Sequence, residues 1–78
     1  MPDRDFEVRQ LCLADRHIDR AEQIIAEQGL ELERLRLKGY DTKLLERTLE
    51  VLEDSLRTMY EHRNIIVMTI RQIDQGLV

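Results

Sequence analysis

The sequence predicts an all-α fold, an antiparallel two-helix hairpin whose helices wind into a left-handed coiled coil. The chain has 78 residues, of which 36% are charged, and it contains only three glycines and one proline. That composition is typical of long helices and leaves little material for β-strands. A chain folded back near Gly39 and Tyr40 would also bring together apolar positions whose residue numbers sum to 80 or 81. These pairs are Leu35/Leu45, Leu32/Leu49, Ile25/Leu56, Ala21/Met59, Ala14/Ile66 and Leu11/Ile70.

The first helix is predicted over about residues 3–37. Pro2 and Asp3 suit a first turn, and no proline interrupts the stretch that follows. Its apolar residues keep a seven-residue repeat, in which Gln28 is the one polar member. The a positions are Leu11, Ile18, Ile25 and Leu32, and the d positions are Ala14, Ala21, Gln28 and Leu35.

A short turn over residues 38–41 leads into a second helix over about residues 42–75. Gly39 can adopt the left-handed conformation that ends a helix, and Asp41 or Thr42 can cap the next one. Gly76 is the expected stop. The a positions are Leu49, Leu56, Arg63, Ile70 and Leu77, and the d positions are Leu45, Leu52, Met59, Ile66 and Ile73.

The two flanks of this single domain, residues 1–78, differ in character. One flank is mostly charged, with Arg36 and Glu46 placed for a salt bridge, whereas the other carries a second apolar stripe with small residues between. A lone hairpin of this size can hardly cover a core, so we expect a homodimer that forms an antiparallel four-helix bundle. The expected dimer interface consists of Phe6, Leu13, His17, Ile24, Leu44, Val51, Ser55, His62, Ile65 and Thr69.

His17 and His62 share that flank, and their numbers place them as neighbours on adjacent helices. Two imidazoles could bind a metal, and a two-fold axis could double them to a four-histidine site. They could instead make dimerisation sensitive to pH, or be plain polar residues at the edge of a bundle. Ala14 and Met59 stand where the Glu-x-x-His spacing of di-iron bundles needs a carboxylate, which argues against such a site.

Arg63 is the one charge at an a position of the second helix, opposite Ile18. Asp15, Asp19 and Glu22 lie within reach on the facing helix, and the ion pair is assigned to Arg63 with Asp19 and Glu22. A partly buried pair of this kind specifies register more than it stabilises. An anion-binding arginine is the functional alternative.

Several classes of function are disfavoured by the composition. The formal net charge is −4 with both signs mixed along the chain, so neither nucleic acid nor an acidic membrane surface is expected as a partner. The apolar run Ile65–Met68 is far too short to span a bilayer. The apolar open end, Ile65–Ile70, lacks a Lys-rich polar face, so a protein partner is favoured over lipid there. The single Cys12 precludes an internal disulfide, and the absence of a signal-peptide pattern favours the cytoplasm. No catalytic motif or cofactor site is recognisable, so we expect no enzymatic activity.

Short motifs distributed along residues 11–66 carry a resemblance to known proteins. They are Ala14–Ile18 with Ala21 and Glu22, then Gly39–Thr42, then Leu52, Glu53 and Leu56, and finally His62 and Arg63. With these the chain resembles a group of short uncharacterised bacterial proteins made of one helical hairpin. The resemblance implies the hairpin and brings no assigned function.

These observations favour a non-enzymatic, self-associating helical hairpin that acts as an interaction or regulatory module for a protein partner the sequence does not identify. A metal- or small-ligand-binding bundle built around His17 and His62 is the alternative.

Overall fold

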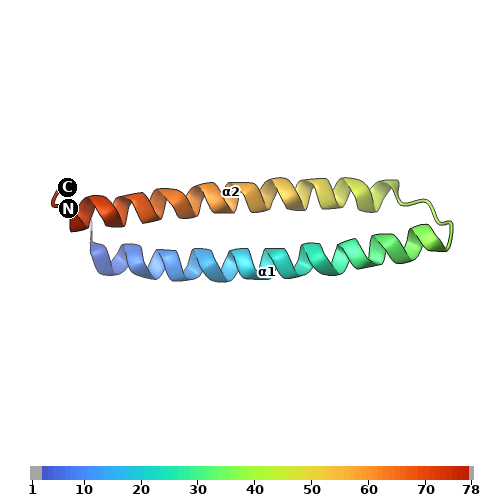
Figure 1. The fold of residues 1–78 in the computed structure, drawn as a ribbon, viewed down its shortest axis with the longest axis horizontal. Helices are drawn as coiled ribbons and strands as arrows, with labels where there is room; N and C mark the ends of the chain where they lie inside the picture. Colours follow the sequence, from blue (N-terminus) through green and yellow to red (C-terminus); the bar gives the residue numbers. More distant parts are fainter. Residues whose placement is uncertain (1–2, 78) are drawn as a thin grey trace.

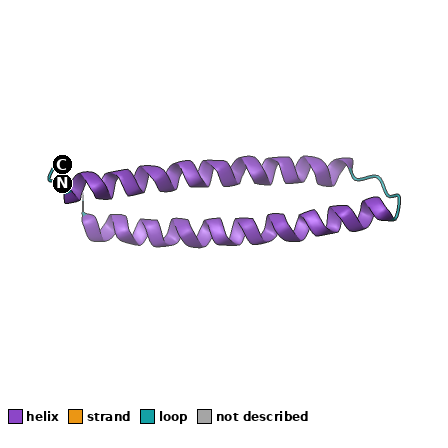
Figure 2. Cartoon of the chain, viewed as in Figure 1, coloured by secondary structure: helices purple, strands orange, loops and turns teal. Residues whose placement is uncertain are grey.

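The computed structural model describes residues 3–77, which form two long α-helices. Helix α1 spans Arg4–Leu37 and helix α2 spans Lys43–Asp74, and the two lie side by side in opposite directions (Figure 1). The molecule measures 58 × 15 × 14 Å, and its described part contains no strand (Figure 2). The prediction of an all-α two-helix hairpin is therefore confirmed. Each observed helix boundary lies within one residue of the expected one.

The start of each helix is capped by an aspartate side chain. The carboxylate of Asp3 accepts a hydrogen bond from the backbone N–H of Asp5 at 3.0 Å, whereas Pro2 lies outside the described residues. Thr42 occupies the N-cap position of α2 but makes no side-chain cap bond. Asp41 supplies the oxygen instead, because its carboxylate accepts from the backbone N–H of Lys43 at 3.1 Å. Of the two expected caps, Asp41 is the one that bonds.

Both helices end at a glycine with positive φ. Gly39 has φ +78° and Gly76 has φ +72°. The N–H of Gly39 donates to the carbonyl of Arg36, and the N–H of Tyr40 donates to that of Leu35, at 3.0 and 3.1 Å. This pair of bonds is the Schellman motif, which satisfies carbonyls that the end of a helix leaves free. It turns the chain within a few residues and so fixes the antiparallel arrangement.

The core follows the predicted seam. Ala14, Ile18, Leu49 and Ile66 are buried, with exposed fractions of 8, 4, 8 and 4%, and all four are predicted a or d residues. The other a and d positions within the helices are half-buried, whereas Leu77, which follows α2, is 67% exposed. Two helices cannot surround their own seam, so most of it keeps some contact with water.

Gly29 and Gly39 should respond oppositely to replacement by alanine. Gly29 lies within α1, where an added Cβ would meet no atom within 4 Å, so Gly29→Ala should stabilise the fold by about 0.5–1 kcal/mol. Gly39→Ala should destabilise it by about 1–2 kcal/mol, because a side chain is strained at positive φ. Urea denaturation followed by circular dichroism at one chain concentration measures both. Shifts of the same sign would contradict this account of the turn.

Candidate functional site

The apolar flank is the surface formed by the ten residues of the expected dimer interface. Eight of them are exposed in the hairpin, and Ile24 and Thr69 are half-buried. The large side chains Leu44, Val51 and Ile65 expose 79, 64 and 62% of their surface. An apolar surface of this extent on such a narrow molecule is typical of an interaction site.

Three hollows lie along this flank. The middle one, of about 280 Å³, is almost wholly apolar and includes His17, Ile24 and Ser55 in its lining. A second, of about 260 Å³, lies nearer the chain termini and is lined in part by Phe6 and His62. A third, of about 250 Å³, is lined by Arg47, Thr48, Val51 and Leu52. Exposed apolar side chains therefore alternate with shallow depressions along the flank. Another helix can pack its side-chain ridges into grooves of this kind.

The residues of α2 that form this flank include no Asp, Glu, Lys or Arg, although Arg47 lies beside them and lines the third hollow. These residues are spaced alternately four and three positions apart in the sequence. They are Leu44, Thr48, Val51, Ser55, Thr58, His62, Ile65, Thr69 and Gln72. The hydroxyls of the three threonines donate to carbonyls one turn back in α2, at 2.9 to 3.2 Å. Because these donors are satisfied within the helix, covering them costs less than covering free hydroxyls. The sequence alone did not indicate these bonds.

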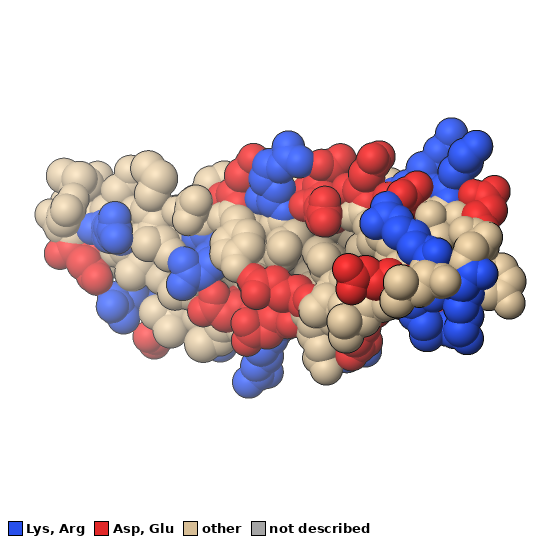
Figure 3. Space-filling view, turned by 45° about the vertical axis from the view of Figure 1, so that its right-hand side comes forward, with Lys and Arg blue, Asp and Glu red and all other residues tan. Residues whose placement is uncertain are grey.

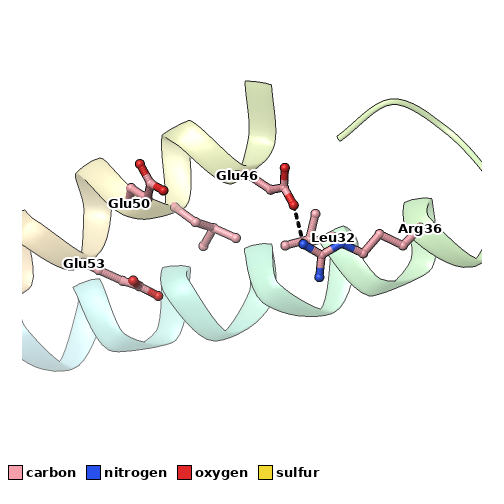
Figure 4. A pocket seen from close by; sticks show the side chains of 6 residues that line it. Leu32, Arg36, Glu46, Glu50 and Glu53 are labelled. Atoms are coloured by element: carbon pink, nitrogen blue, oxygen red, sulfur yellow. Dashed lines mark hydrogen bonds and ion pairs between the residues drawn. The ribbon is translucent and has the colours of Figure 1, made fainter. Parts of the chain in front are cut away.

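The opposite flank is held by ion pairs and hydrogen bonds between the helices. Arg36 pairs with Glu46, as the sequence indicated, beside a hollow of about 450 Å³ that Glu50 and Glu53 also line (Figure 4). Figure 3 shows both signs of charge interspersed over the middle and the turn end, whereas the end with both termini is more sparsely charged. This flank has the character of a solvated surface.

Arg63 finds a different partner from the two assigned to it. Its Nε donates to Oδ1 of Asp15 at 2.5 Å. Glu22 lies seven residues beyond Asp15, roughly 10 Å along the helix, and accepts instead from the hydroxyl of Tyr60. Asp19 makes no hydrogen bond with Arg63 in the described part of the chain. The register pair is thus Arg63 with Asp15.

The hydrogen bond to Glu22, and after it partial removal from water, raises the pKa of Tyr60. Because the folded pKa lies above the unfolded one, the stability from this bond is present below the unfolded value, about 10, and is lost as pH rises through the folded value. Alkaline titration of tyrosine absorbance in a Tyr40→Phe background should show a lower Tyr60 pKa once Glu22→Gln is added. Identical titration curves with and without Glu22→Gln would contradict the assignment.

The two histidines lie on the apolar flank but line separate hollows, His17 the middle one and His62 the one near the termini. Within residues 3–77 no group of three or more His, Cys, Asp or Glu side chains could hold a metal ion. Cys12 is exposed and has a free thiol. A metal site on these histidines would therefore need ligands from a second chain.

Comparison with known proteins adds no identification: no family model, curated protein or solved structure matches this chain. Neither helix contains, within its described residues, an apolar stretch long enough to cross a membrane.

Proposed function

We propose that this protein is a non-enzymatic, self-associating helical hairpin. Two copies pack through the apolar flank into a left-handed four-helix bundle, which serves in the cytoplasm as an interaction or regulatory module for another protein. The observation that carries the proposal is the exposure of Leu44, Val51 and Ile65 on a flank where α2 has no charge.

The small core of the single hairpin supports the proposal. Only four residues in the described part of the chain are buried, and small domains with so little core generally need a partner, a metal or a disulfide. Covering the apolar flank would turn its half-buried residue Ile24, and half-buried seam residues beside it such as Ala21, into core. The charged flanks of both copies, with the Arg36–Glu46 pair, would stay outside and accessible to a second protein.

Sedimentation equilibrium tests self-association directly. The unmodified chain should be a dimer at micromolar concentration, and Val51→Glu or Ile65→Glu should weaken dimerisation roughly tenfold or more, because each places a charge in the apolar interface. Ala26→Glu is the matched control, since Ala26 is exposed on the charged flank and should leave the dimer unchanged. A monomeric unmodified chain would overturn the proposal.

A further inference from the structure

We propose that the turn end of this protein attaches to the surface of an anionic lipid bilayer, through a patch formed by Leu37, Lys38, Tyr40 and Lys43. These four residues, called the turn patch, are all exposed and lie in or beside the turn at one end of the rod-shaped molecule (Figure 1). None of them belongs to the apolar flank. The patch therefore stays accessible at the end of a bundle, whichever way two copies pack, and the inference does not depend on self-association.

The apolar members of the turn patch are side chains that the fold does not use. Leu37 and Tyr40 expose 90 and 63% of their surface, and Leu37 is the most exposed of the large hydrophobic residues in the described part of the chain. The packing of α1 against α2 covers neither of them. A tyrosine has an apolar ring and a polar hydroxyl, and such side chains are favoured at the level of the lipid headgroups.

Basic residues gather at the same end of the molecule. The two lysines of the chain, Lys38 and Lys43, lie on either side of the turn, and neither forms an ion pair within residues 3–77. Residues 34–47 hold five of the chain's 12 basic residues and only two of its 16 acidic ones. This end is therefore positive, although the chain as a whole has a formal net charge of −4.

The acidic residues near the turn are either engaged or set back from it. Asp41 caps α2 with its carboxylate, and Glu46 is paired with an arginine. Glu33, Glu31 and Glu50 lie five to seven residues from the nearest lysine, roughly 7–10 Å along their helices. Because salt screens charges over about 8–10 Å, a bilayer that touches the turn is influenced more strongly by the lysines than by these carboxylates.

The shape of this end favours a bilayer over a protein partner. The hairpin measures only 15 × 14 Å across its long axis, an end face on the order of 200 Å², whereas a stable protein interface buries about 800 Å² on each partner. A bilayer needs no such area, since the insertion of a few apolar side chains and the attraction of lysines to anionic headgroups act together. The open end lacks this combination, because both lysines lie at the turn.

Flotation with lipid vesicles tests the attachment. The chain should float with vesicles of equal parts phosphatidylserine and phosphatidylcholine, and it should stay unbound with phosphatidylcholine alone. Lys38→Glu combined with Lys43→Glu should weaken binding roughly tenfold or more, because each lysine is attracted to the anionic surface. Leu37→Ala should weaken binding several-fold, because less apolar surface enters the bilayer. Circular dichroism checks that each variant keeps its helices.

Two controls make the same kinds of change away from the turn. Arg9→Glu combined with Arg16→Glu changes the net charge as much as the lysine reversal does, at exposed positions nearer the open end. Leu30→Ala truncates a leucine that is 71% exposed, two helical turns before Leu37 on the same face of α1. Both controls should bind the vesicles as the unmodified chain does.

Tryptophan fluorescence gives an independent readout, because the chain contains no tryptophan of its own. The emission of Tyr40→Trp should shift to the blue when the anionic vesicles are added, whereas that of Leu30→Trp should stay unchanged.

A chain that does not float with the anionic vesicles overturns the attachment and leaves an acidic segment of a protein as the partner for these residues. Flotation that survives the reversal of both lysines, or an unchanged Tyr40→Trp emission, overturns the turn patch as the site. Sedimentation equilibrium measures self-association separately, so either proposal can fail while the other stands.

Discussion

Replacing Ile66 with alanine is expected to destabilise the hairpin by about 2–5 kcal/mol. Ile66 exposes only 4% of its surface and is one of four buried residues among residues 3–77. Ala14 lies opposite Ile66 in the seam, because their residue numbers sum to 80. The methyl group of Ala14 cannot fill the space that the lost side chain leaves. Since so few residues form the core, the loss is a large share of the total stability. Urea denaturation followed by circular dichroism measures it.

Leu37→Ala is the control for Ile66→Ala. Leu37 is 90% exposed at the end of α1, so its truncation should change stability by no more than about 0.5 kcal/mol. Both variants need the same chain concentration as the unmodified protein, because the proposed self-association would add stability that depends on concentration. Equal losses in the two variants would show that the seam does not carry the stability of the fold.

The fold could be predicted because its determinants are local and repetitive. The seven-residue repeat placed Ala14, Ile18, Leu49 and Ile66 in the seam, and the structure buries all four. Gly39 fixed the turn, since the left-handed conformation that a Schellman motif requires is strained for most other residues. The helix boundaries, and which residues of the two helices lie opposite one another, followed from these two features.

The partners of long side chains could not be predicted with the same certainty. Asp15, Asp19 and Glu22 share one side of α1. The repeat gives the position of each residue along the helix, but it does not give the rotamers that decide which carboxylate Arg63 reaches. The Tyr60 hydroxyl donates to Glu22 and so competes with Arg63 for that carboxylate, which the seven-residue repeat does not reveal. The hollows were missed for a similar reason, because their shapes depend on how neighbouring side chains turn.

Replacing Arg63 with glutamate should cause the largest loss of folding stability after Ile66→Ala. Arg63→Glu removes the bond to Asp15 and places a fourth carboxylate near Asp15, Asp19 and Glu22 at a half-buried seam position. Breaking a fully buried pair costs about 3–5 kcal/mol, but the Arg63 and Asp15 side chains are 35 and 48% exposed, so water screens the interaction. We expect a loss of about 2 kcal/mol, measured by urea denaturation at low salt.

The exchanged pair separates register from mere loss of charge. Adding Asp15→Arg to Arg63→Glu restores an ion pair at the same height, so it should recover most of the lost stability, and high salt should reduce the recovery. Arg57→Glu is the matched control, because Arg57 pairs with Asp54 on the surface of a single helix, where both side chains are 70% exposed. That reversal should cost less than about 1 kcal/mol. If the exchanged pair is no more stable than Arg63→Glu alone, the contact between Asp15 and Arg63 does not help to set the register of the two helices.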